Sequence, residues 1–136
     1  MIGVQTVPDD QVDKYGIVSG RPVTGDIFEV DDMVEKPAIG TAPSNLAILG
    51  RYIITPAIFD ILENTGKGAG GEIQLTDGLK TLGEKQRILA YDFKGRRYDV
   101  GDKLGFLEAT VEYGLRTPGL EERFMKYLKS YFDDQK

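Results

Sequence analysis

The pattern of apolar and polar positions predicts that the chain begins with strands. Residues 2–7 form a short strand candidate, and strand patterns return at 15–18 and again from 27 to 37, with turn residues between them. Two or three strands joined by hairpin-like connections fit this arrangement. The run 45–54 is almost continuously apolar, which is typical of a central strand covered on both faces.

Helical patterns follow this run. Thr55 is a candidate N-cap and Pro56 a candidate first helical residue, and apolar positions then recur at helical spacing up to Asn64. A second helix is expected after a glycine-rich stretch and is expected to stop at Gly83. Both helices are short and have one apolar face.

The remaining residues predict a hairpin and then two helices. We expect strands at 87–93 and 96–100, joined by a turn at residues 94–95. Apolar stripes at helical spacing then cover the last third, at Leu104, Leu107, Val111 and Leu115 and at Leu120, Phe124, Leu128 and Tyr131. Strands first and helices interleaved later predict an α/β or α+β fold. With no long linker, residues 1–136 are expected to form a single unit.

Composition excludes several classes of function. The 22 acidic and 17 basic residues give a net charge of −5, which argues against binding to nucleic acid or to an anionic membrane. The chain has no cysteine and no histidine, so zinc sites of the usual ligands, thiol nucleophiles and imidazole bases are excluded. No stretch approaches the roughly 18 apolar residues of a membrane span, and we expect a cytoplasmic protein.

The stretch GKGAGGEIQLTD at 66–77 looks at first like a phosphate-binding loop. A Walker loop needs a preceding strand and a Gly-Lys-Ser/Thr ending, whereas here a helix is expected before the loop and Gly71 is followed by Glu72. A dinucleotide fingerprint fails as well, because that turn must leave a strand. We therefore predict a flexible or tightly turned connection, with Glu72 at the positive end of the next helix.

Five motifs in order carry a resemblance to one family. They are YGIV at 15–18, VEKP at 34–37, APSNLAILGRY at 42–52, GAGGEIQLTD at 68–77 and YDVGDKLGF at 98–106. Together they resemble the C-terminal half of bacterial UTP:glucose-1-phosphate uridylyltransferases, also called UDP-glucose pyrophosphorylases. The resemblance covers nearly the whole chain, and the nucleotide-binding front half of the family has no counterpart in it.

This resemblance implies a fold and a reaction. The fold is the C-terminal part of a Rossmann-like mixed sheet with flanking helices, as in nucleotide-diphospho-sugar transferases, and thus a fragment of the full fold. The reaction makes UDP-glucose and pyrophosphate from UTP and glucose-1-phosphate with Mg²⁺, in an oligomeric enzyme. The chain would supply the sugar-phosphate site, and the isolated chain would be inactive because the nucleotide loop and one metal ligand are missing.

The resemblance also assigns residues. Gly16 would leave room for the sugar, Glu35 would accept sugar hydroxyls, and Lys36 would meet the sugar phosphate as the catalytic residue. Adjacent strand residues normally point to opposite faces, so Glu35 and Lys36 can serve one ligand only where the strand ends, and Pro37 provides an ending. Two anionic groups about 4 Å apart repel by about 4 kcal/mol at an effective dielectric near 20. A lysine with a divalent cation offsets that repulsion.

Further assignments follow from the remaining motifs. Ile48 would line the sugar pocket, Asn45 would hold the turn before it, and Asp99 would bind Mg²⁺. Asp102 is expected to cap the next helix. From the residues alone, Gly16 fits a strand end equally well, and a Glu-Lys pair beside a turn is more often a solvated surface pair.

Two other functions stay open at this point. The chain could act as a non-catalytic module that binds a sugar nucleotide or mediates oligomerisation, since half of the active site is absent. It could also belong to a relative with a different nucleotide or sugar, because base-reading residues lie in the missing half. The aromatic final helix at 123–132 is expected to dock on a core, with a subunit contact as the second interpretation.

Overall fold

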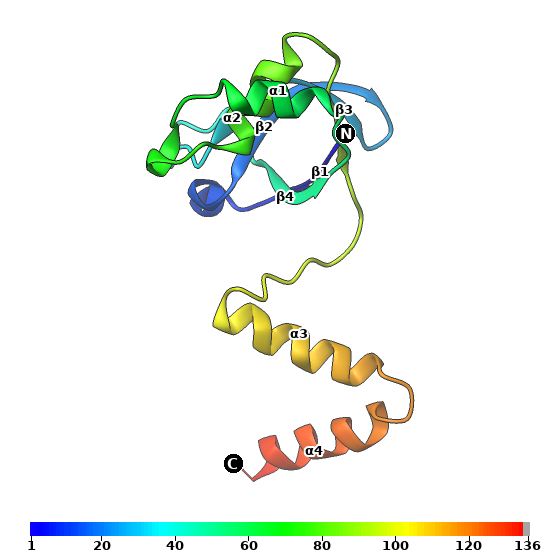
Figure 1. Cartoon of the computed structure of the whole chain (residues 1–136). Helices are drawn as coiled ribbons and strands as arrows, with labels where there is room; N and C mark the ends of the chain where they lie inside the picture. Colours follow the sequence, from blue (N-terminus) through cyan, green and yellow to red (C-terminus); the bar gives the residue numbers. More distant parts are fainter. Residues whose placement is uncertain (135–136) are drawn as a thin grey trace. The chain divides into compact units, whose positions relative to one another are not determined.

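The strands of the computed structural model, which describes residues 1–134, form one closed sheet (Figure 1). Their bounds are β1 Ile2–Thr6, β2 Gly16–Thr24, β3 Ile27–Glu35, β4 Leu46–Tyr52 and β5 Leu89–Asp92. The order is β1-β4-β2-β3-β5, and β5 closes the sheet by pairing parallel with β1 and antiparallel with β3. The sheet is therefore mixed, and helices pack on it, which confirms the α/β expectation.

The hairpin of β2 and β3 brings the first two family motifs together. The register pairs Gly16 with Glu35 and Ile17 with Val34, so the start of β2 lies beside the end of β3. Gly25, at a φ of +52°, makes the turn, a backbone conformation that glycine adopts without steric cost. The predicted hairpin is confirmed, but β2 continues through Ser19 and Gly20, where the sequence predicts a turn, and the turn itself lies at residues 25–26.

Strand β4 is covered on both faces, as its apolar run predicts. Ile48 belongs to the main core, whereas its neighbour Ala47 packs with Val12 and Ile17 on the other face. The main core contains Ile2, Val4, Val18, Met33, Ile48, Ile58, Ile61, Leu79, Leu82, Ile88 and Ala90. Burial of each large aliphatic side chain stabilises the fold by roughly 1.5–3 kcal/mol.

Two helices cover this sheet. Helix α1 spans Ala57–Glu63 and packs on α2, Leu75–Gly83, which in turn packs on β3. Leu79 and Leu82 anchor α2, since each is only 2% exposed. A salt bridge of 2.6 Å between Lys80 Nζ and Asp32 Oδ1 adds a link from α2 to β3. Short 3-10 helices lie at Asp9–Lys14 and Ala69–Gly71.

The predicted N-cap of α1 is wrong. The helix begins at Ala57 with Pro56 in the cap position, and no side chain caps it. Thr55 contributes its carbonyl oxygen to the Ile58 N–H, whereas its hydroxyl donates to Gln86 Oε1 at 3.2 Å. The hydroxyl therefore joins the start of α1 to the segment after α2.

The predicted second hairpin is also wrong. Strand β5 covers only Leu89–Asp92, and residues 96–100 form no strand. Both edges of β5 are occupied, one by β1 and the other by β3. A returning strand would need an edge of β5 that is already hydrogen-bonded.

Residues beyond Lys94 form a second unit. The contacts divide the chain into Met1–Lys94 and Gly95–Lys136, where the sequence predicts a single unit. The second unit contains α3, Lys103–Arg116, and α4, Glu121–Asp133. Asp102 caps α3 as predicted, because its Oδ2 accepts from the Gly105 N–H at 3.0 Å. None of the described helices is long and apolar enough to cross a membrane.

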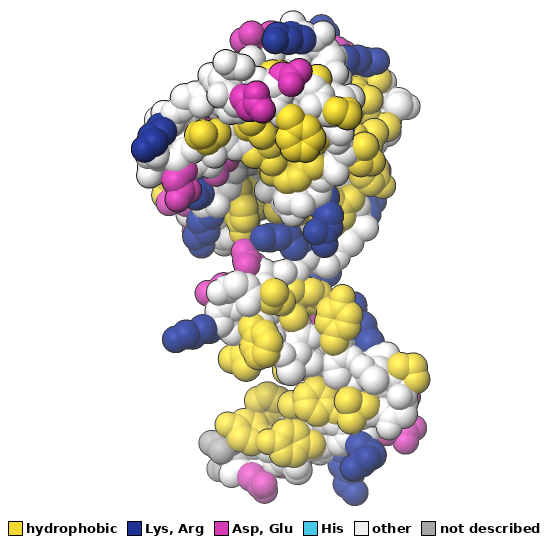
Figure 2. Space-filling view, viewed as in Figure 1, with side chains coloured by type: hydrophobic (Ala, Val, Ile, Leu, Met, Phe, Trp, Pro, Cys, Tyr) yellow, Lys and Arg dark blue, Asp and Glu magenta, His cyan; other side chains and the backbone are white. Residues whose placement is uncertain are grey.

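The predicted docking of the last helix on a core is not observed in the described residues. Tyr127, Tyr131 and Phe132 are each more than half exposed, and α4 contains no buried residue. Apolar side chains gather along both helices of this unit (Figure 2). Helices α3 and α4 touch where Phe124 lies over Gly114, whose missing side chain permits the close approach.

Candidate functional site

The first strand of the β2–β3 hairpin begins with a buried glycine that faces three side chains. A Cβ on Gly16 would lie 2.9 Å from Glu35 Oε2, 3.0 Å from Thr76 Oγ1 and 3.2 Å from Ile48 Cδ1. These residues come from β3, α2 and β4, so three separate elements converge above Gly16 in β2. The structure thus brings together three of the predicted residues, Gly16, Glu35 and Ile48, and adds Thr76.

Glu35 has a different partner for each carboxylate oxygen. Its Oε2 accepts a hydrogen bond of 2.5 Å from the Thr76 hydroxyl, and its Oε1 lies 3.9 Å from Lys36 Nζ. The side chain is only 14% exposed. A carboxylate has more lone pairs than these two contacts use, so it can accept further hydrogen bonds from a ligand.

Lys36 bends the chain directly after the end of β3. Its φ is +46°, and it is the only non-glycine residue with a positive φ among the described residues. Its N–H donates to the Tyr15 carbonyl at 3.0 Å, and the next residue, Pro37, is buried. Such a conformation costs of order 1–3 kcal/mol. The turn places the Glu35 and Lys36 side chains next to each other, which confirms the predicted strand end.

Tyr52 is influenced by the charge of Glu35, which the sequence does not reveal. It ends β4 and is partly buried against the main core. Burial is the main cause that raises the pKa of its phenol above the ordinary value, and the negative charge of Glu35 raises it further. This electrostatic influence acts between β3, which holds Glu35, and β4, which holds Tyr52. No local sequence pattern predicts it.

The turn before β4 is held by Ser44, whereas the sequence suggested Asn45. The Ser44 hydroxyl donates to the Val18 carbonyl at 2.5 Å and accepts from the Leu46 N–H at 2.9 Å. Asn45 contributes its backbone carbonyl, which accepts from the Val7 N–H. Ile48, 6% exposed, is then held in the core with its Cδ1 toward Gly16.

The glycine-rich stretch forms a closed turn, as predicted. The Gly68 N–H donates to the Glu72 carbonyl and the Gly71 N–H to the Gly68 carbonyl, at 2.8 and 3.0 Å. These amides therefore point into the loop itself. Glu72 does not lie in the first turn of α2, because the helix begins at Leu75 and its first-turn acid is Asp77.

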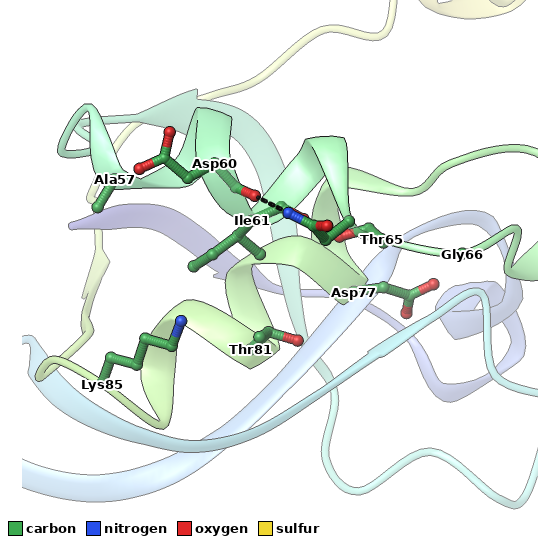
Figure 3. A pocket seen from close by; sticks show the side chains of 9 residues that line it. Ala57, Asp60, Ile61, Thr65, Gly66, Asp77, Thr81 and Lys85 are labelled. Atoms are coloured by element: carbon green, nitrogen blue, oxygen red, sulfur yellow. Dashed lines mark hydrogen bonds between the residues drawn. The ribbon is translucent and has the colours of Figure 1, made fainter.

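A cleft of about 620 Å³ lies between α1 and α2 (Figure 3). Its lining includes the acids Asp60 and Asp77 together with Lys85, and it contains none of the predicted site residues. Two carboxylates disfavour a phosphate ligand there. The group around Gly16 is thus the better candidate for sugar-phosphate chemistry.

Asp99 belongs to the second unit. Its Oδ1 accepts from the Gly101 N–H and its Oδ2 from Arg97, both at 3.1 Å, and about half of its side chain is exposed. The described residues contain no group of three or more acidic, histidine or cysteine side chains able to hold a metal. Asp99 can therefore supply one carboxylate without partner ligands from a cluster, which suits Mg²⁺ only where phosphates and waters complete its shell.

Comparison with known proteins extends this picture. The profile of a family described as nucleotidyl transferase matches residues 1–114. UTP--glucose-1-phosphate uridylyltransferases of Staphylococcus epidermidis and Staphylococcus haemolyticus are 50% and 51% identical over 129 residues. These alignments cover 95% of this chain and 45% of each relative, so the chain spans less than half their length.

Solved structures give the same result. A UDP-glucose pyrophosphorylase complexed with UDP-glucose has a TM-score of 0.82 and 46% identity, over 85% of this chain and 44% of its own. A UTP-bound UGPase from Acinetobacter baumannii has a TM-score of 0.79 and 42% identity, over 93% of this chain and 44% of its own.

Proposed function

Because the chain belongs to the nucleotidyl transferase family, we propose that it is the sugar-phosphate-binding part of an enzyme that forms UDP-glucose and pyrophosphate from UTP and glucose-1-phosphate. It corresponds in this proposal to the C-terminal half of such an enzyme. The complete enzyme is expected to be a cytoplasmic homo-oligomer.

The observation that carries this proposal is the convergence above Gly16. A largely buried carboxylate at Glu35, an apolar side chain at Ile48 and a cation at Lys36 surround Gly16, where even a Cβ would crowd the Glu35 and Ile48 side chains. Sugars are bound by carboxylates that accept hydrogen bonds from their hydroxyls and by surfaces without obstructing side chains, whereas phosphates need cations. All of these features lie within one small region.

Each residue then has a role in the reaction. Gly16, which has no side chain, lets Glu35 lie against the strand backbone at the sugar site, Glu35 accepts hydrogen bonds from the sugar hydroxyls, and Ile48 forms the apolar floor. Lys36 neutralises the phosphate that attacks the α-phosphorus of UTP, so its stabilisation grows as the two phosphates approach. No general base is required, since a phosphate monoester with a second pKa near 6 is already largely ionised at neutral pH.

The family generally uses a divalent metal ion, and Mg²⁺ is the ion proposed here. Asp99 would hold it through one carboxylate oxygen, and the ion would reduce the repulsion between the reacting phosphates. The described part of the chain contains no cluster of three or more possible metal ligands, so the remaining ligands would come from the substrates, from water and from the rest of the enzyme.

Calorimetry with residues 1–136 tests the site. Glucose-1-phosphate and UDP-glucose should bind to the unchanged chain, and Glu35→Gln and Lys36→Ala should each weaken binding roughly tenfold or more, because each removes a charged hydrogen-bonding group. Lys67→Ala, which removes a charge from the glycine-rich loop, is the matched control and should have no effect. Equal affinity of all four proteins would contradict the proposal.

A turnover assay separates this proposal from the non-catalytic module. Residues 1–136 alone should release no pyrophosphate from UTP and glucose-1-phosphate, whereas addition of the complementary half of a homologous enzyme should restore release. Specific UDP-glucose binding with no turnover in any combination would favour the module. Faster turnover with another sugar phosphate would change the substrate assignment.

A further inference from the structure

Thr76 is a polar side chain in an otherwise apolar set. It is 5% exposed, and among the described residues it is the one polar or charged residue that is buried to the same degree as the apolar core. It comes from the GEIQLTD motif and lies in the first turn of α2. A buried hydroxyl must have a hydrogen-bonding partner, since burying it without one is unfavourable.

The partner is Glu35, which lies 41 residues earlier in the chain. The Thr76 hydroxyl donates to Oε2 at 2.5 Å, and both atoms face the missing Cβ of Gly16. The threonine itself is held firmly, because α2 is anchored by Leu79 and Leu82 and the χ1 angle of threonine is restricted. The bond therefore connects a flexible glutamate to a fixed point on a helix.

We propose that Thr76 is a positioning residue for sugar recognition, an inference that rests on the proposed function. By holding Oε2, Thr76 fixes the carboxylate plane of Glu35, so that Oε1, on the side of Lys36, is presented to the sugar hydroxyls. A fixed acceptor rejects a sugar that lacks the matching hydroxyl more strongly than a mobile one does, because the mobile carboxylate can turn to another partner. Thr76 thereby sets selectivity without touching the reacting atoms.

A purely structural role for the same bond makes a different prediction. If Thr76 only tethers α2 to β3, its loss should lower stability and leave sugar selectivity unchanged. Three variants separate the two roles. Thr76→Val removes the hydroxyl at similar volume, Thr76→Ser retains it, and Thr81→Val is the control on the exposed side of the same helix.

The first measurement needs no ligand. Side-chain ¹³C relaxation in residues 1–136 should show Glu35 ordered in the unchanged chain, in Thr76→Ser and in Thr81→Val, and mobile in Thr76→Val. Equal order of Glu35 in Thr76→Val would overturn the inference. If Thr76→Val does not fold, another measurement on the unchanged chain replaces it. The Thr76 hydroxyl proton should exchange slowly with solvent when glucose-1-phosphate is bound, because it stays hydrogen-bonded to Glu35. Its release on binding would overturn the inference.

The second measurement compares glucose-1-phosphate with its deoxy analogues by calorimetry. The unchanged chain should prefer glucose-1-phosphate over at least one analogue, and Thr76→Val should reduce that ratio of affinities roughly tenfold, whereas Thr76→Ser and Thr81→Val should not. An unchanged ratio in Thr76→Val would overturn the inference. If the unchanged chain binds no sugar phosphate, both the proposed function and the role of Thr76 in sugar recognition are wrong. The relaxation experiment would still show whether the Thr76 hydroxyl holds the Glu35 side chain in place.

Discussion

Gly16 and Glu35 are register partners at the open end of the β2–β3 hairpin, and a Cβ on Gly16 would lie 2.9 Å from the Glu35 carboxylate. Gly16→Ala should therefore displace Glu35 and weaken glucose-1-phosphate binding at least tenfold. The crowding should lower the free energy of unfolding by about 1–3 kcal/mol. Gly66→Ala is the control, because nothing lies within 4 Å of a Cβ at that position. Calorimetry and chemical denaturation measure both effects, and unchanged sugar-phosphate affinity in Gly16→Ala would contradict the assignment.

Lys36 has a strained backbone conformation and a side-chain charge that is proposed to bind phosphate. Its replacement by glycine should therefore change stability and ligand binding in opposite directions. Lys36→Gly removes a side chain from a residue at a φ of +46° and should raise the free energy of unfolding by about 1 kcal/mol or less. The same variant should weaken binding of glucose-1-phosphate because the cation is lost. Lys36→Ala should bind equally weakly without the gain in stability. Similar stabilities of the glycine and alanine variants would show that the backbone at this position is not strained.

Replacement of Lys36 in a complete enzyme tests its catalytic role. In an active protein assembled with the complementary half, Lys36→Ala should lower kcat more than it raises the Kd for glucose-1-phosphate, because charge is neutralised mainly as the phosphates meet. Steady-state kinetics together with calorimetry measure the two terms. A loss of affinity with an unchanged kcat would mark Lys36 as a uniform binder.

Tyr52 should report the charge of Glu35. Burial, followed by that charge, raises the pKa of its phenol above the ordinary value of 10.0. Glu35→Gln should lower this pKa part of the way, and ¹³Cζ resonances of tyrosine, assigned with Tyr52→Phe, measure it. Because the pKa of Tyr52 is higher in the folded state than in the unfolded state, its contribution to the free energy of unfolding is fully present below pH 10. This contribution is lost as the pH rises through the folded-state pKa. Tyr52→Phe should therefore lose less stability in alkali than the unchanged chain.

Gly105 is expected to control the position of Asp99. A Cβ on Gly105 would collide with the Asp99 carbonyl oxygen and lie 3.0 Å from its carbon. Gly105→Ala should shift the amide resonances of Asp99 and Gly101 and destabilise the start of α3, whereas Lys103→Ala in the same turn should do neither. Unshifted Asp99 resonances in Gly105→Ala would show that the two backbones are farther apart than in this structure.

The sequence predicts well those features whose cause is local. The β2–β3 hairpin, the central strand β4 and the Asp102 cap each follow from residues within a few positions of one another. The second hairpin fails because its turn signal at residues 94–95 says nothing about which strand edges are free, and β5 has none. The Thr55 cap fails for a related reason, since Gln86, 31 residues away, takes the hydroxyl.

The candidate site shows the same division. The resemblance identified Gly16, Glu35, Lys36 and Ile48, and the structure brings them together in the first unit. Thr76 and Tyr52 were missed because their links to Glu35 span different elements. A threonine in the first turn of an amphipathic helix, on the side of its buried leucines, is the signal that could have indicated Thr76.

In the proposed site, the left-handed conformation of Lys36 lets two neighbours along one backbone serve two chemically different halves of one ligand. Consecutive Cα atoms are separated by about 3.8 Å whatever the rest of the protein does. The points at which the two side chains leave the backbone are thus fixed by covalent geometry, insensitive to breathing of the sheet or to changes elsewhere in the core, and only side-chain rotation changes the distance between the two charged groups. An insertion of a single amino acid between Glu35 and Lys36 would increase the distance between these two backbone positions, and a ligand that contacts both side chains would no longer fit in the same way.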